Sequence, residues 1–199
     1  IKNSGWAGIL AISGDELAGT LTTTATATTS RIESAKGAGI LASGLQSINL
    51  ADLVIDKTRM RPSIGDGMEI FEIGDGIALV GIREHVSLAR IGIINNPRVG
   101  LFLDGGPQSI APTFAIENVG IGNPEVAGQY GLVYQNGIEY DPAFNAIVFD
   151  SEAGPQNNVF DAEDEANLAA PQGVQSFGNA AIIGTNGLIG TNGIIGTNG

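Results

Sequence analysis

Carboxylates and arginines in the middle of the sequence are the side chains best suited to chemistry. Carboxylates that converge in one cleft about 5 to 10 Å apart would serve glycoside or uronate chemistry. No spacing along the chain singles out such a pair, because acidic residues beside glycine are typical of turns. The sequence therefore predicts no catalytic residue, and it offers a set of ligand-binding candidates: Arg59, Arg61, Asp66, Asp75, Glu84 and Asp104.

Other kinds of site find little support. The chain has no cysteine and one histidine, His85, so disulfides, thiolate chemistry and clusters of histidine ligands are excluded. The acidic run at residues 161–165 is open to two interpretations, a solvated loop or short acidic helix and a Ca²⁺ site. The EF-hand spacing is absent. We predict no metal and no cofactor, with calcium as the weak alternative.

The formal net charge of −12 argues against two classes of partner, nucleic acids and anionic membrane surfaces. No apolar run reaches the roughly 18 residues of a membrane span, so membrane insertion is not expected. The chain starts at Ile1 with neither an initiator methionine nor an apolar signal segment. We therefore expect an excised piece of a longer extracellular or cell-surface protein.

One short motif recurs along the chain and would position these side chains. The motif is a glycine followed by two apolar residues, and it begins at positions 8, 39, 76, 100 and 131. We call these five motifs the openings; they are 24 to 37 residues apart. Apolar residues between the openings alternate with period 2, which predicts strands. The step from Leu88 to Ile91 breaks the alternation and predicts a tight corner. Repeats of this length indicate stacked units, each strand pairing in parallel with its counterpart in the next unit.

These residues, at 76–134 and more loosely at 39–55, resemble the right-handed parallel β-helix repeats of pectate-lyase-like proteins. The resemblance implies an all-β fold, a solenoid of about five to seven coils. We expect the β-helix at 1–150, an acidic linker at 151–181 and a tail of hexapeptide repeats at 182–199. The Asn-x-Asp, Asp-Asp, Gly-His-Gly and Arg-x-Lys motifs of polygalacturonases are absent, and the fold alone does not set the activity.

The repeat predicts the core and one projecting loop. The loop is residues 57–74, which carry Arg59 and Arg61 and which we expect to contact a ligand. The expected core residues are Ile77, Leu79, Val86, Leu88, Ile91, Ile93, Leu101, Leu103, Phe114, Ile116, Val119 and Ile121.

The second apolar residue of each opening should point away from the core, since alternate side chains on a strand face opposite ways. Stacked units would then expose an apolar stripe that something must cover. Another protomer is the favoured cover, and the tail hexads are the alternative, either folded like left-handed β-helix hexads or ordered only on packing. The predicted interface residues are Leu10, Leu41, Phe102, Val133, Ile183, Ile189 and Ile195.

Three functions follow as expectations. The first is a structural or adhesive module that self-associates as an oligomer or end to end. The second is a carbohydrate-active, lyase-like or hydrolase-like β-helix, or one that binds glycans. The weakest is ice binding by the alternating Thr22, Thr24, Thr26 and Thr28.

Overall fold

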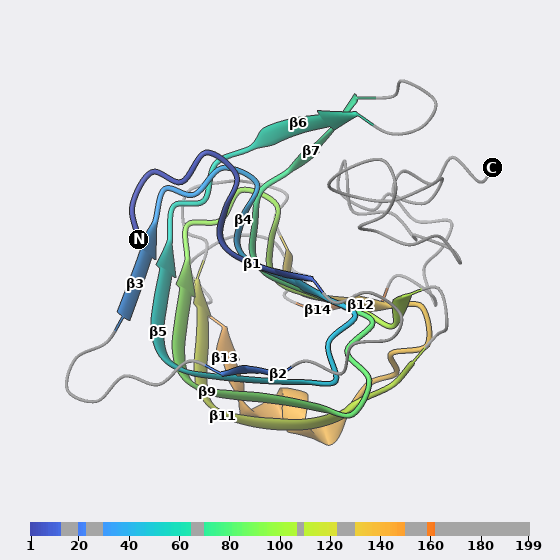
Figure 1. Ribbon diagram of the computed structural model, residues 1–199. Coiled ribbons are helices and arrows are strands. Elements are labelled where there is room, and N and C mark those ends of the chain that lie inside the picture. Colours follow the sequence, from blue (N-terminus) through green and yellow to red (C-terminus); the bar gives the residue numbers. More distant parts are fainter. Residues whose placement is uncertain are drawn as a thin grey trace.

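The computed structural model describes residues 1–12, 20–22, 30–64, 70–106, 110–122, 130–149 and 159–161. These residues form an all-β fold with two six-stranded parallel sheets and one antiparallel hairpin (Figure 1). Thr24, Thr26 and Thr28, which were considered for ice binding, lie outside the described residues, as do Asp66 and the tail hexads.

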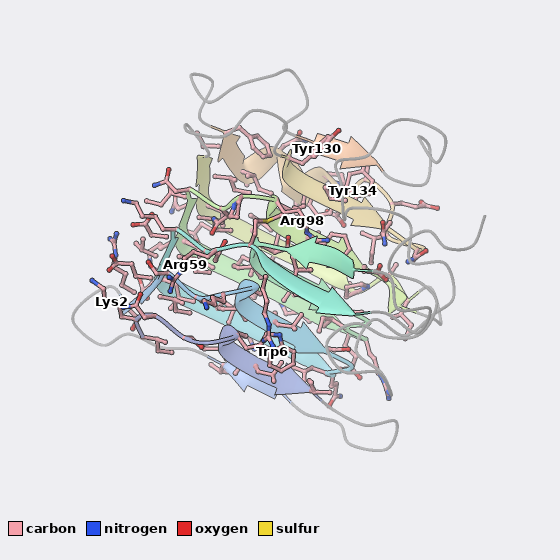
Figure 2. The ribbon with its side chains drawn as sticks, turned by 90° about the horizontal axis from the view of Figure 1, so that it is seen from above. Lys2, Trp6, Arg59, Arg98, Tyr130 and Tyr134 are labelled. Carbon is pink, nitrogen blue, oxygen red and sulfur yellow. The ribbon has the colours of Figure 1, made fainter. Side chains whose placement is uncertain are left out.

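The sheet that we call sheet I contains the glycine openings. Its order is β1 (Ala7–Ile12), β4 (Ala38–Ser43), β8 (Asp75–Val80), β10 (Val99–Asp104), β12 (Tyr130–Gln135) and β14 (Val159–Asp161). Strand β14 falls in the segment expected to be an acidic linker. Figure 2 shows the strands stacked from the N-terminal end to the C-terminal end.

The other sheet, sheet II, holds the long strands that follow each opening. Its order is β13 (Ile147–Phe149), β11 (Thr113–Gly122), β9 (His85–Ile94) and β5 (Ser47–Asp56), and β5 also pairs with β2 (Thr20–Thr22) and β3 (Ser30–Glu33). A short 3₁₀ helix, η2 (Pro142–Ala146), precedes β13, and Asp141 caps it by accepting a hydrogen bond from Ala143 N at 2.8 Å.

The chain passes alternately through the two sheets, which enclose one core (Figure 1). The register aligns the first apolar residue of each opening, because Ile77 pairs with Ile40 on one side and with Leu101 on the other. All twelve predicted core residues are buried in this core or, for Phe114 and Ile116, packed partly buried against it. The predicted inward-facing positions are thus confirmed.

The predicted tight corner is also confirmed, and it repeats on neighbouring strands. Asp52, Arg90 and Asn118 have φ values of 57°, 55° and 53°, and each lies in the gap between aligned pairs of β5, β9 and β11. A left-handed residue turns the strand without ending its pairing. Asparagine and aspartate tolerate this conformation best, which makes Arg90 the unusual member of the column.

Glycine at the openings is required by the close approach of neighbouring strands. A Cβ added to Gly39 would lie 2.6 Å from the carbonyl oxygen of Gly76, and one added to Gly76 would lie 2.5 Å from that of Gly100. Each such Cβ would also meet an isoleucine of sheet II closer than 3.0 Å. The repeated glycine therefore sets the packing distance between the two sheets.

The prediction of a loop at residues 57–74 is wrong in its secondary structure. Strands β6 (Arg61–Ile64) and β7 (Ile70–Ile73) pair as an antiparallel hairpin, which projects from the body of the fold (Figure 1). Just before the hairpin, Thr58 is buried and donates to Asn96 Oδ1 at 2.9 Å and to Gly74 O at 3.1 Å. The hairpin thus begins and ends at a fixed polar contact.

Most of the outward-facing apolar stripe predicted along sheet I is not open to solvent in the single chain. Leu41, Phe102 and Val133 are buried within the single chain, Phe102 with 1% of its surface exposed. Parallel strands are commonly buried on both faces, and β4, β8, β10 and β12 follow that rule. Of the four predicted residues on sheet I, Leu10 on the terminal strand β1 remains exposed, at 42%.

Candidate functional surfaces

The two candidate arginines lie near the N-terminal end and contact the protein itself. The guanidinium of Arg59 donates from Nη2 to Ser34 O at 2.9 Å and to Asn3 Oδ1 at 3.3 Å, so it links two neighbouring corners. The guanidinium carbon of Arg61 lies 5.5 Å from the centre of the Trp6 ring, within the range of a cation–π contact. Both arginines thus hold the base of the hairpin to residues near the N-terminus.

Asp75 forms a buried ion pair with Arg98. Arg98 Nε donates to Asp75 Oδ1 at 2.6 Å and Arg98 Nη2 donates to Asp75 Oδ2, a two-pronged geometry. The two side chains are 3% and 2% exposed, and the guanidinium also lies 5.5 Å from the centre of the Phe102 ring. This carboxylate is therefore held by a structural contact between β8 and the start of β10.

Asp104 is likewise buried and held by hydrogen bonds. Its Oδ2 accepts from Gln135 Nε2 at 2.6 Å and from Asn136 Nδ2 at 2.9 Å, and its Oδ1 accepts from Gly106 N at 2.6 Å. The register sets Asp104 opposite Val80, five residues along β8 from Asp75, which separates the two carboxylates by roughly 16 Å along the strands. They do not form the closely spaced pair that glycoside chemistry uses.

Glu84 lies apart from both, at the exposed start of β9. Its backbone carbonyl accepts from the hydroxyl and the amide of Thr113, both at 2.9 Å. The structure thus does not bring the candidate ligand residues that it describes into one site. The described residues contain no group of three or more histidine, cysteine, aspartate or glutamate side chains placed to hold a metal.

An exposed ion pair links two of the left-handed corner residues, Asp52 of β5 and Arg90 of β9. Arg90 Nε donates to Asp52 Oδ1 at 2.7 Å and Arg90 Nη2 donates to Asp52 Oδ2 at 2.8 Å. The hydrogen bond from Arg90 lowers the pKa of Asp52, burial opposes this, and the positive charge of Arg90 adds to the lowering. The pair favours ionised Asp52 in the folded chain.

The pKa of Asp52 should therefore depend on Arg90. Since the folded-state pKa lies below the ordinary 3.8, the contribution of Asp52 to stability is present above pH 3.8 and is lost as the pH falls through the lowered value. Arg90→Ala should return the pKa of Asp52 toward 3.8, as followed by NMR titration of its carboxyl carbon. Arg83→Ala is the control, and an equal shift in both variants would contradict the assignment. The change in overall stability should be small, since exposed pairs contribute little.

The exposed large apolar side chains of the described residues gather at the two ends of the stack. Ile1 precedes β1, Leu10 and Ile12 lie on β1, Tyr140 immediately precedes the cap of η2, and Val148 lies on β13. Sequence reasoning found Leu10 and missed the other four. Their position near the first and last predicted strands could have indicated exposure, because the terminal strands of a stack have a neighbour on one side only.

The two ends also differ in charge. The described residues within 1–59 carry five exposed cations, Lys2, Arg31, Lys36, Lys57 and Arg59, and three carboxylates, Glu33, Asp52 and Asp56. Lys2 forms an ion pair with Glu33, and Arg31 forms one with Asp56. The side chains of Lys2 and Arg59 lie at the same margin of the stack (Figure 2). The described residues 110–122 and 130–149 contain Glu117, Glu139 and Asp141 and no lysine or arginine. Among the described residues, lysine and arginine thus outnumber carboxylates by two at the N-terminal end, five against three, whereas the C-terminal end is acidic.

No family model, curated protein or solved structure matches this chain. Among the described residues, no helix is long and apolar enough to cross a membrane.

Proposed function

We propose that the chain is a structural or adhesive module of a secreted or cell-surface protein and that it self-associates end to end. In this proposal the two sheets are the walls of a right-handed parallel β-helix. Support for the winding comes from the register, in which each strand of sheet I pairs in parallel with the strand of the next passage.

One observation carries the proposed self-association. Exposed apolar side chains gather at the two ends of the stack, and the described residues of these ends differ in charge, with cations and carboxylates at the N-terminal end and carboxylates alone at the C-terminal end. An end with apolar side chains and unpaired strand edges is an adhesive surface. This difference favours contact between unlike ends, because two acidic C-terminal ends would repel each other.

The burial and hydrogen bonding of the candidate carboxylates favour a structural module over a carbohydrate-active enzyme. Asp75 and Asp104 are buried and accept hydrogen bonds from neighbouring strands, so both stabilise the stack. Incubation of the purified chain with acidic polysaccharides distinguishes the two functions. Cleavage of the polysaccharide at enzyme-like rates would overturn the proposal of a structural module.

Self-association should be sensitive to a charge at the N-terminal end. Leu10→Asp removes an apolar side chain worth about 1.5 to 3 kcal/mol on full burial, so we expect association to weaken at least about tenfold. Sedimentation velocity over a range of concentrations measures this. Ala115→Asp, which places the same charge on the exposed flank of β11, is the matched control and should leave association unchanged. A wild-type chain that stays monomeric at every concentration would contradict self-association.

A further inference from the structure

The terminal strand β1 presents an open edge. Sheet I begins at β1, which pairs with β4 along one side and has no other strand beside it among the described residues. Leu10 and Ile12 on this strand are 42% and 48% exposed, whereas Leu41, which pairs with Leu10, is buried. One further strand in parallel register would cover both side chains and would pair the free backbone groups of β1.

The stack restricts which sequence can serve as that strand. In each neighbouring pair of sheet I, a Cβ on the opening glycine would collide with the carbonyl oxygen of the next opening glycine, from Gly8 and Gly39 at 2.7 Å to Gly100 and Gly131 at 2.8 Å. A strand placed before β1 therefore needs glycine opposite Gly8. The two residues after this glycine would stack on Ile9 and Leu10, so both should be aliphatic.

The C-terminal hexads repeat this triplet. Residues 187–189 read Gly-Leu-Ile and residues 193–195 read Gly-Ile-Ile, as residues 8–10 read Gly-Ile-Leu. In this register Leu188 would lie on Ile9 and Ile189 on Leu10. The next residue, Gly190, falls in the column of Ala11, Ala42 and Leu79, where side chains of several sizes are accepted.

We infer that a tail hexad of one copy adds as a parallel strand to the open edge of β1 in a second copy. This inference rests on the proposed end-to-end self-association and names its connecting element. Sheet I runs in chain order from β1 to β14, so the tail follows the strand farthest from β1, five strand spacings or about 24 Å away. A copy stacked on the β14 end brings its own β1 to the acidic end and the tail.

Disulfide cross-linking tests the register, because the chain has no cysteine of its own. Register partners on adjacent parallel strands are about 4.8 Å apart, within disulfide reach. A chain with Leu10→Cys, mixed with a tagged chain carrying Ile189→Cys or Ile195→Cys, should give an oxidised heterodimer. With Ile12→Cys in place of Leu10→Cys, the two cysteines would be two residues, about 6.6 Å, out of register and about 8 Å apart, beyond disulfide reach, so little heterodimer should form.

Equal yields from the Leu10→Cys and Ile12→Cys mixtures would overturn the inferred register. A chain carrying both Leu10→Cys and Ile189→Cys that closes within one monomer, at a yield independent of concentration, would place the tail on its own β1 and overturn the second copy. If the mixed chains self-associate by sedimentation and yet form no heterodimer, strand addition by the tail fails and the proposed function stands. If they do not self-associate at all, the proposed function fails first.

The two kinds of glycine in the tail give a second test in the full chain. Gly187→Ala with Gly193→Ala puts a Cβ at the colliding position and should weaken self-association at least about tenfold. Gly184→Ala with Gly190→Ala puts the same atoms at the position aligned with Ala11, Ala42 and Leu79, where side chains are accepted, and should leave association near that of the wild type. Equal effects of the two double variants would contradict the triplet match.

Discussion

Gly76→Ala should lower the free energy of unfolding by about 3 kcal/mol. The added Cβ would lie 2.5 Å from the carbonyl oxygen of Gly100 and closer than 3.0 Å to the side chain of Ile93. Overpacking a core usually costs about 1 to 3 kcal/mol. We expect the upper end of that range, because one of the colliding atoms is backbone in the middle of a sheet. Urea denaturation followed by circular dichroism measures the change.

Gly120→Ala is the matched control for this prediction. It replaces a glycine of a parallel strand as well, in β11, but a Cβ there would have no atom within 4 Å. Its effect should stay within about 0.5 kcal/mol, as for surface substitutions in general. Equal losses from Gly76→Ala and Gly120→Ala would show that loss of glycine, and not close approach, determines the cost.

The sequence predicted the parallel stack because its repeat gives both the alternation and the unit length. Ile77, Leu101 and Leu132 follow a glycine at the same place in each unit, so their inward position and alignment could be read from the pattern alone. The tight corner was predicted from the three-residue step from Leu88 to Ile91, and the structure places a left-handed residue there, Arg90. Both features are local and periodic.

The burial of the outer face was present in the sequence but was misread. Continuous apolar runs, such as residues 101–103 and 132–134, are typical of parallel strands buried on both faces. Alternation placed Phe102 and Val133 on an outward-facing stripe that another protomer or the tail would have to cover. The sequence also contained a signal for the hairpin β6–β7, because the Gly-Asp-Gly sequence at 65–67 is typical of a hairpin turn and lies between the two short segments that pair.

The candidate site could not be predicted, because contacts across the stack depend on register between units of unequal length. Asp75 meets Arg98 23 residues later, and Asp104 meets Gln135 31 residues later. No fixed spacing links acid to partner. Carboxylates that looked available for a ligand therefore proved to be engaged with neighbouring strands.

The ion pair of Asp75 and Arg98 should show a strong dependence of each partner on the other. Arg98→Met removes the guanidinium and leaves a carboxylate that is 3% exposed without its cation. Breaking a buried pair from one side costs about 3 to 5 kcal/mol, because the remaining charge is uncompensated. We expect a loss of that size for Arg98→Met, measured by urea denaturation at neutral pH.

The double variant Asp75→Leu with Arg98→Met should recover most of this loss. Both charges are then absent, the new side chains are apolar, and Phe102 beside them offers an apolar surface. Replacing a whole buried pair by apolar residues is often neutral or stabilising, whereas removing one partner is not. The thermodynamic cycle of the two single variants and the double variant isolates the coupling, which should be at least about 2 kcal/mol. Additive effects would mean that Asp75 and Arg98 act independently, and that each carboxylate and guanidinium is stabilised by other neighbours.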